Sequence, residues 1–324
     1  MKQKSRMSPQ KKRKNTAPGT SEEQYRKQCC SESAVSSSLK MQQRVRNRSN
    51  SCTFEITTAD KGGYKMKLRN RHILIFGGTS GIGLGIAKRL IEAGADVVIA
   101  GRNKEKLERA SSSFAPFQIH SIQADISNVQ DHNSYFEQAA EMIGQVDAFV
   151  NAAAIEVRRG TYEPWDVTEL EWDRASAIDF KGAFFLMRNE IDYLKKHNTH
   201  GNILNIASNA ALMPIFGLYG AAKLAIIEWT KALGRQFGHN GIIINAIAPG
   251  ATLTPMTAYY AVDNAPYPRH AIDRFITVEE QAELALFLLS DIGEITAAET
   301  IISDGGDKGH YLIRDEAGYA YKNA

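Results

Sequence analysis

The chain has 324 residues and a formal net charge of +3, but this charge is divided unevenly along the sequence. Residues 1–65 hold 15 Lys and Arg against 5 Asp and Glu, a net charge of +10, which leaves −7 for residues 66–324. All three cysteines (Cys29, Cys30 and Cys52) lie in the first part. The composition therefore excludes a disulfide scaffold, a thiolate metal site and a catalytic cysteine from residues 66–324, which are numerous enough for one large α/β domain.

Residues 1–65 are predicted to be a disordered basic arm. The segment is rich in Ser, Gln, Asn, Lys and Arg and has no helical or strand periodicity, so it buries too little apolar surface to offset the entropy of ordering. Its basic run at 11–14 is interpreted as a solvated tail, with a nuclear-import signal or a nucleic-acid patch as alternatives. The sequence holds neither an apolar leader near its start nor a run of about 18 apolar residues, so we expect a cytoplasmic protein without a membrane span.

Residues 66–324 alternate between two hydrophobic patterns. Short apolar runs predict strands at 73–76, 96–100, 119–124, 146–151, 201–207, 242–248 and 299–303. Apolar residues at helical spacing predict helices at 82–92, 104–111, 129–143, 168–194, 219–237 and 278–289, the fourth with a break near Gly182. This alternation predicts an α/β fold, a single Rossmann-like doubly wound domain whose seven-stranded parallel sheet carries helices on both faces.

A glycine-rich loop joins the first expected strand to the first expected helix. Residues 77–83 read Gly-Gly-Thr-Ser-Gly-Ile-Gly, and glycines at such a place allow a tight turn and the close approach of a pyrophosphate to the helix N-terminus. The spacing is GxxxGxG rather than GxGxxG. Its position directly after a strand favours a dinucleotide site over an ordinary glycine-rich turn.

Further motifs follow in chain order, and together they resemble the short-chain dehydrogenase/reductase family. The loop at 77–83 is similar to the family's TGxxxGIG, with Phe76 in place of the usual Thr. Asn-Ala-Ala-Ala at 151–154 stands where the family has NNAG, and Tyr219 and Lys223 form its YxxxK pair. The resemblance spans essentially all of residues 68–307. It implies an NAD(P)-dependent oxidoreductase that interconverts a ketone or aldehyde and an alcohol.

The resemblance also implies where the cofactor binds and which cofactor it is. An acidic residue after the second strand would bind the ribose 2′-hydroxyl of NAD and repel a 2′-phosphate. Arg102 stands there with no acid beside it, and a guanidinium forms charge-assisted hydrogen bonds to phosphate, so we expect NADP, with NAD or a merely solvated arginine as alternatives. The implied cofactor-binding residues are Gly77, Thr79, Ser80, Gly81, Ile82, Gly83, Arg102, Asp125, Ile126, Asn151, Ala152, Ala153, Tyr219, Lys223, Pro249, Gly250, Thr252 and Thr254.

The expected catalytic residues are Ser208, Tyr219 and Lys223. Tyr219 and Lys223 are four residues apart and share a helix face, and an adjacent ammonium stabilises the phenolate of a group whose ordinary pKa is about 10. Ser208 follows a strand, where its hydroxyl would hold the substrate oxygen. A YxxxK pair alone is usually a buried Tyr beside a surface Lys, and such a serine can be a strand cap. The other motifs favour the catalytic interpretation.

Asp179 is an unusual fourth member of this set. The resemblance places it where an Asn commonly holds a water in the proton relay from the lysine. A carboxylate near Lys223 would stabilise the ammonium and oppose phenolate formation, so we expect the working pH to move upward. Some enoyl-reducing members of the family look similar here, which keeps enoyl-thioester reduction as an alternative.

Substrate, partners and metal are less constrained by the sequence. Candidate pocket residues are Tyr259, Tyr260, Tyr267, Arg269, His270, Glu156, Arg158 and Arg159, whose arginines favour an anionic or polyhydroxylated substrate. We expect no metal site, no nucleic-acid binding by the domain and, from the family, a homo-oligomer (dimer or tetramer). The alternative of a different class is a catalytically idle nucleotide-binding protein whose basic arm recruits nucleic acid or a protein partner.

Overall fold

The computed structural model describes residues 68–155, 167–213, 217–258, 261, 263 and 265–307. The strands are β1 (His72–Phe76), β2 (Asp96–Gly101), β3 (His120–Gln123), β4 (Ala148–Asn151), β5 (Gly201–Ile206), β6 (Ile242–Pro249) and β7 (Thr300–Ser303). The α-helices in the described ranges are α2 (Gly81–Glu92), α3 (Lys104–Ser112), α4 (His132–Ile143), α5 (Glu169–Ala175), α6 (Ala183–Lys196), α7 (Leu218–Phe237) and α8 (Val278–Leu289). The predicted arm at 1–65 lies outside the described residues.

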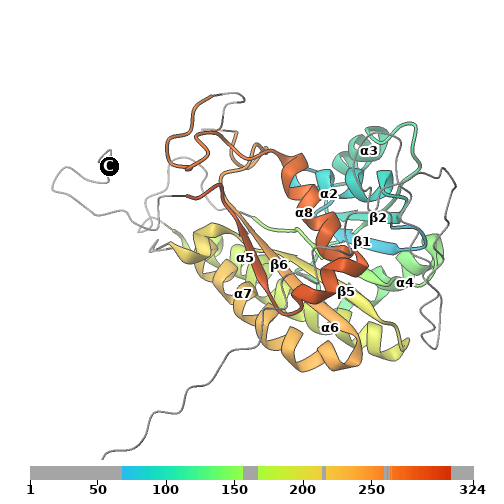
Figure 1. Cartoon of the computed structure of the whole chain (residues 1–324). Coiled ribbons are helices and arrows are strands. Elements are labelled where there is room, and N and C mark those ends of the chain that lie inside the picture. Colours follow the sequence, from blue (N-terminus) through green and yellow to red (C-terminus); the bar gives the residue numbers. More distant parts are fainter. Residues whose placement is uncertain are drawn as a thin grey trace, which may run out of the picture. The chain divides into compact units, whose positions relative to one another are not determined.

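The strands form one seven-stranded sheet in the order β3-β2-β1-β4-β5-β6-β7, and every neighbouring pair is parallel (Figure 1). The strand order reverses between β1 and β4. At such a switch point the loops after the two strands diverge, and ligands bind in the crevice at the carboxyl edge of the sheet. The predicted seven-stranded, doubly wound α/β fold is confirmed.

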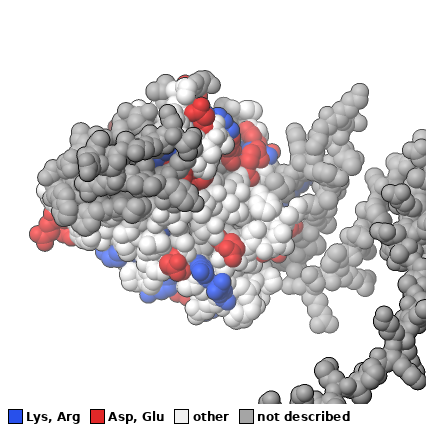
Figure 2. Space-filling view, turned by 60° about the vertical axis from the view of Figure 1, so that its left-hand side comes forward, with Lys and Arg blue, Asp and Glu red and all other residues white. Residues whose placement is uncertain are grey.

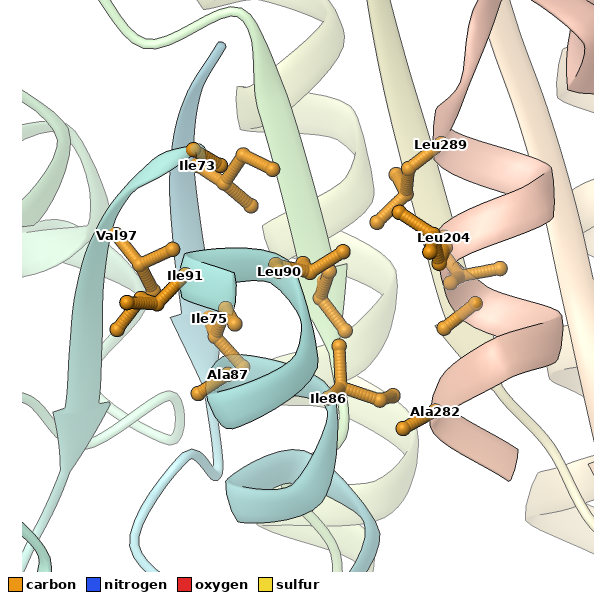
Figure 3. Packing of buried hydrophobic residues seen from close by; sticks show 14 of the residues in the cluster. Ile73, Ile75, Ile86, Ala87, Leu90, Ile91, Val97, Leu204, Ala282 and Leu289 are labelled. Carbon is orange, nitrogen blue, oxygen red and sulfur yellow. The ribbon is translucent and has the colours of Figure 1, made fainter. Parts of the chain in front are cut away.

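One face of the sheet is covered by α2, α3 and α8. Ile73 and Ile75 of β1 point to this face, where they pack with Ile86 and Leu90 of α2 and Leu289 of α8 (Figure 3). Each of these side chains is buried. Burial of an aliphatic side chain of this size contributes about 1.5–3 kcal/mol, which explains why the strand and both helices carry apolar residues here.

The opposite face is covered by α4 and α6 through a cluster of aromatic rings. Phe76 of β1 points to this side because successive strand residues alternate between faces. Phe136 of α4 meets Phe149 of β4 edge to face at 5.1 Å between ring centroids and meets Tyr193 of α6 at 5.5 Å. Such aromatic pairs add about 0.5–1.5 kcal/mol each to the burial of their area. Because both faces are covered, the strands appear in the sequence as continuous apolar runs.

The predicted helical region at 168–194 is divided by a π-helical stretch, Ser176–Gly182. Thr168 and Glu171 form a capping box that begins α5, and the wider turn follows directly. At Gly182 an added Cβ would lie 2.7 Å from the carbonyl oxygen of Ile126, so only glycine allows this close approach. The predicted break is therefore confirmed as a change of helix type. π-Helical turns occur frequently at functional sites, and this one contains Asp179.

Candidate active site

A large cavity of about 1480 Å³ opens at the carboxyl edge of the sheet. Ordinary small-molecule pockets hold about 300–1,000 Å³, so this one has room for a dinucleotide and a substrate together. Of the predicted site residues, Asp125 and Asn151 do not line it. The predicted residues that do line it are Gly77, Thr79, Ser80, Gly81, Ile82, Gly83, Arg102, Ile126, Ala152, Ala153, Asp179, Ser208, Tyr219, Lys223, Pro249, Gly250, Thr252 and Thr254.

The glycine loop is shaped by close backbone contacts. Gly77 has a φ of +80°, and an added Cβ would lie 2.6 Å from the backbone of Ala152. At Gly83 a Cβ would lie 2.4 Å from the carbonyl oxygen of Gly77. Helix α2 begins beside this loop with no acidic residue in its first turn and no side-chain cap from Ser80. Its first N–H groups therefore suit an anion, and the loop fits a dinucleotide pyrophosphate.

Asp125 shapes the wall from behind. Its Oδ1 accepts hydrogen bonds from the backbone N of Ser127 at 2.9 Å and from the Oγ of Ser127 at 2.8 Å. The resulting turn carries Ile126 to the cavity surface. Asp125 thus holds the turn that positions Ile126 in the cavity wall.

Asn151 also lies behind the wall, in a buried polar cluster. Its Nδ2 donates to Glu190 Oε2 at 3.0 Å and to Asn205 Oδ1 at 2.9 Å. Burial raises the pKa of Glu190 to about 8, although the hydrogen bond from Asn151 opposes this shift. Sequence reasoning missed Glu190, because a Glu in an amphipathic helix ordinarily faces water.

Tyr219 and Lys223 lie on the same face of α7, as predicted. The Nζ of Lys223 is 5.6 Å from the centroid of the Tyr219 ring. It donates to the carbonyl oxygen of Ile206 at 2.8 Å, and the side chain is buried. Burial lowers the pKa of Lys223, and the attraction of Asp179 partly offsets this. The phenol therefore stands beside a nearly dehydrated cationic group.

Asp179 projects from the π-helical turn into the same region. Its Oδ1 accepts from the backbone N of Ile155 at 3.0 Å, and its Oδ2 has no hydrogen-bond partner among the described residues. Burial raises the pKa of Asp179 to about 6, while the charge of Lys223 and the bond from Ile155 act in the opposite direction. The carboxyl group thus changes charge near neutral pH.

Ser208 sits between β5 and the short 3-10 turn Asn209–Leu212. Its Oγ accepts a hydrogen bond from the backbone N of Ala210 at 3.1 Å. This bond orients the hydroxyl group through an oxygen lone pair, and the hydroxyl hydrogen can still be donated to a ligand. Ser208 and Tyr219 line the same cavity.

The cavity end beside β2 carries two cations. Arg102 lines it from an exposed position, and its carbonyl oxygen accepts from Gln123 Nε2 at 2.9 Å. Asn103 caps α3 by accepting from the backbone N of Lys106 at 2.8 Å, and Lys106 also lines the cavity. Sequence reasoning missed Lys106. The sequence could have indicated it, because Lys106 follows Arg102 by four residues and lies in the first turn of the next helix.

The substrate candidates divide into three groups. Tyr267 and Arg269 line the cavity, whereas His270 is buried and does not. Arg269 is paired, since its Nε lies 2.7 Å from Asp307 Oδ1. The candidates that lie outside the described residues are Glu156, Arg158, Arg159, Tyr259 and Tyr260.

No group of three or more His, Cys, Asp or Glu side chains in the described ranges is arranged to hold a metal ion. None of the helices described there combines the length and the apolar character needed to cross a membrane.

Comparison with known proteins identifies the family. A family model described as "Enoyl-(Acyl carrier protein) reductase" matches residues 77–307. The 2,5-dichloro-2,5-cyclohexadiene-1,4-diol dehydrogenase of Sphingobium indicum is 34% identical over 248 residues, which cover 74% of this chain and 97% of that protein. The chain belongs to the short-chain dehydrogenase/reductase family. It is accordingly an oxidoreductase that acts on CH–OH groups.

Solved structures of the family bear on the cofactor. The 3-ketoacyl-(acyl-carrier-protein) reductase from Brucella melitensis, complexed with NADH, is 30% identical with a TM-score of 0.68, over 74% of this chain and 99% of that chain. A short chain dehydrogenase from Burkholderia cenocepacia, in complex with NADP, is 30% identical with a TM-score of 0.66, over 74% and 98%. This member of the family is an NAD(P)-dependent oxidoreductase.

Proposed function

We propose that this oxidoreductase interconverts a ketone or aldehyde and the corresponding alcohol, with Tyr219 as the proton donor and acceptor. The observation that carries the proposal is the shared cavity. Tyr219, Ser208 and the buried Lys223 line it together with the glycine loop that suits a dinucleotide. A proton-transfer group and a cofactor cradle in one cavity are what hydride transfer to a carbonyl requires.

Each of these side chains has a distinct task. The bound nicotinamide supplies or accepts the hydride at the carbonyl carbon. Ser208 donates a hydrogen bond to the carbonyl oxygen, on which negative charge develops during reduction. Tyr219 delivers its phenolic proton to the same oxygen, and Lys223 stabilises the phenolate that remains. In alcohol oxidation the same groups act in reverse, and Tyr219 accepts the proton.

Asp179 tunes this proton transfer. Below its pKa of about 6 the carboxyl group is neutral and leaves Lys223 as the dominant local charge. Above that pH it is ionised, stabilises the ammonium and disfavours the phenolate. Alcohol oxidation, which begins from the phenolate, is therefore expected to require a higher pH than it would with an amide at this position.

NADP is the proposed cofactor, with NAD as the alternative. Arg102 and Lys106 line the same end of the cavity, and no acidic side chain stands between β2 and the beginning of α3. Two cations at this place favour a 2′-phosphate over a 2′-hydroxyl.

NADPH oxidation with a panel of ketones, hydroxy-ketones and keto-sugars tests the function. Wild-type protein is expected to turn over at least one class. Tyr219→Phe is expected to lower kcat by about 10²–10⁴-fold while it still binds NADPH, because only the phenolic hydroxyl group is removed. If wild type and Tyr219→Phe were equally slow on the whole panel while both bound NADPH, the carbonyl-reductase function would be rejected.

Enoyl-thioester reduction is the second candidate. The matching family model carries the description "Enoyl-(Acyl carrier protein) reductase", and Asp179 departs from the usual Asn. Crotonyl-CoA separates the two functions, since it offers a C=C bond next to a thioester. Faster NADPH oxidation with crotonyl-CoA than with any ketone of the panel would establish this candidate.

A homo-oligomer is also proposed. Large apolar side chains are exposed on three helices, namely Leu170 and Trp172 on α5, Phe184 on α6 and Leu224 on α7. The face drawn in Figure 2 is largely uncharged. Apolar groups of this kind commonly mark an interface, and a second copy would cover them symmetrically. Light scattering is expected to report a dimer or tetramer for the wild type and a smaller species for Leu224→Glu.

The arm at 1–65 is proposed to be dispensable for the activity of residues 66–324. On the face drawn in Figure 2 the Lys and Arg side chains are scattered among acidic and uncharged residues and form no continuous basic strip. Any nucleic-acid binding is expected to depend on the arm, because the arm carries a net charge of +10, and to weaken steeply with salt. Deletion of residues 1–65 is expected to leave NADPH affinity unchanged. A loss of NADPH affinity in the truncated protein would reject the proposal that the arm is dispensable.

Cell fractionation tests the predicted cytoplasmic location.

A further inference from the structure

Arg269 is held in the cavity wall by the segment that follows β7. The backbone N of Ala271 donates to the carbonyl oxygen of Gly306 at 3.1 Å, and the backbone N of Ile272 donates to that of Gly305 at 3.2 Å. These bonds bring the chain after β6 and the chain after β7 side by side. Arg269 belongs to the first segment.

Asp307, at the end of the second segment, fixes the guanidinium group. Arg269 Nε lies 2.7 Å from Asp307 Oδ1 and 3.0 Å from Oδ2, and its Nη2 lies 2.8 Å from the Sδ of Met213. The Asp307 side chain is 3% exposed, whereas that of Arg269 is 25% exposed. Asp307 is thus the more deeply buried anchor, and Arg269 is the more exposed partner; both line the cavity.

The pair is connected to the catalytic serine. Asn209 Nδ2 donates to Asp307 Oδ2 at 2.8 Å, and Asn209 is the residue directly after Ser208. All four residues of this chain of contacts, from Ser208 through Asn209 and Asp307 to Arg269, line the same cavity. A substrate whose reacting oxygen is bound by Ser208 therefore extends toward a guanidinium of fixed orientation.

The positive charge of the Arg269 guanidinium group is balanced by the carboxylate of Asp307. A substrate carboxylate would approach Asp307 together with Arg269, so it would lose its hydration for little net attraction. An uncharged hydroxyl or carbonyl oxygen has a much smaller desolvation cost and still accepts a hydrogen bond from a charged donor. The pair therefore favours a neutral oxygen over an anion.

We infer that Arg269, positioned by Asp307, binds a second, uncharged oxygen function of the substrate. The enzyme then selects neutral bifunctional compounds, such as diketones, hydroxy-ketones and diols, over monofunctional ketones and over oxo acids. This inference rests on the proposed carbonyl-reductase function of the same cavity.

Three cyclic ketones of similar shape test it: cyclohexane-1,4-dione, cyclohexanone and 4-oxocyclohexanecarboxylate. We expect kcat/KM for the dione to exceed that for each of the other two by about tenfold or more, the size of one hydrogen bond to a charged group. Equal values for the dione and cyclohexanone, or a preference for the oxo acid, would overturn the inference.

Two variants separate recognition from structure. Arg269→Met is expected to remove the advantage of the dione, mainly through KM, and to leave kcat/KM for cyclohexanone within about threefold. Asp307→Asn leaves the positive charge of Arg269 unbalanced, so the ratio of oxo-acid to dione turnover is expected to rise about tenfold. Arg269→Lys, which retains the charge without the planar fork, is the matched control and is expected to keep only part of the preference.

The outcomes distinguish the inference from the function on which it rests. NADPH affinity and the far-UV circular dichroism spectrum of each variant verify the fold. An equal loss of turnover for the dione and cyclohexanone in well-folded Arg269→Met, or an unchanged ratio in Asp307→Asn, rejects the role of Arg269. Turnover of monofunctional ketones or oxo acids alone rejects the inference and leaves the carbonyl-reductase function standing. Failure of every ketone tested, in the presence of NADPH binding, rejects the function itself.

Discussion

The two halves of the cavity are built from different parts of the chain. The half proposed for the cofactor is made largely of backbone, with Gly77 and Gly83 packed against main-chain atoms and the N-terminus of α2 beside the glycine loop. The substrate half is made of paired side chains, of which Arg269 and Asp307 lie 38 positions apart in the sequence. A cradle built of backbone therefore needs glycine at its closest contacts, a requirement that the loop sequence displays, whereas selectivity depends on side-chain pairs that only folding brings together.

The largest effect on cofactor binding is expected where the backbone cradle is obstructed. Gly83→Ala places a Cβ 2.4 Å from the carbonyl oxygen of Gly77, so the loop must shift and NADPH affinity is expected to fall by up to about a hundredfold. Isothermal titration calorimetry measures this loss. The matched control is Gly238→Ala, because nothing lies within 4 Å of a Cβ added there. Similar affinities for both variants would contradict the proposed role of backbone in the cofactor half.

A smaller effect, on the preference for NADPH over NADH, is expected from a change at Arg102, a side chain in the cofactor half. Arg102→Asp replaces the cation with a carboxylate that repels a 2′-phosphate, so the NADPH to NADH ratio of kcat/KM is expected to fall by about ten- to a hundredfold. Steady-state kinetics with both cofactors measures it. Lys104→Asp makes the same charge change two residues away, at a position that does not line the cavity, and is expected to change the ratio little. A ratio that is unaltered in Arg102→Asp would refute the NADP assignment.

At the junction of the two halves, Asp179→Asn is expected to shift a pH profile. Removal of the negative charge favours the phenolate, so alcohol oxidation should reach half of its maximum roughly one pH unit lower. The pKa of Asp179 in the folded protein is about 6, above the ordinary carboxyl value of 3.8. The folded protein therefore loses stability as the pH rises from the ordinary carboxyl pKa to about 6. The variant should therefore also be more stable than the wild type above pH 6, by at most about 3 kcal/mol. Complete inactivity would instead give Asp179 a specific chemical role.

Behind the cofactor half, Glu190→Gln is expected to change stability without changing turnover. The folded state retains a proton on Glu190 up to a pH of about 8, whereas the unfolded chain releases it near the ordinary carboxyl pKa. The wild type therefore loses stability with rising pH until about pH 8, and the variant lacks this loss. Urea unfolding of both proteins between pH 5 and pH 9 measures the difference. If the free energies of unfolding of the two proteins changed in parallel with pH over this range, Glu190 would be ionised in the folded protein.

Much of the fold followed from hydrophobic pattern. The runs at 73–76 and 96–100 predicted β1 and β2 because both faces of the sheet are buried, and such strands are uninterrupted in apolar residues. The helical break near Gly182 was predicted, but its π-helical character was not. Composition holds no signal for a single wide turn, and the close approach of Gly182 at its end to the backbone of Ile126 joins segments that are far apart in the sequence.

The candidate site could be predicted in part. The glycine loop and the pair Tyr219 and Lys223 are local in sequence, so their spacing carries the prediction. The positions of Asp125 and Asn151 behind the wall could not be read from spacing, because a residue next to a site and a residue lining it have the same sequence signature.

The sequence by itself determined the α/β architecture, the nucleotide loop and the identity of the residues expected to transfer the proton, because each depends on short-range periodicity or on a local motif. Only the tertiary structure decided that Glu190 is buried, that Asp179 has a pKa near neutrality beside Lys223, and that Arg269 is neutralised by Asp307. Burial and charge pairing depend on which segments meet in space, and contacts between distant segments leave no periodic trace in the chain.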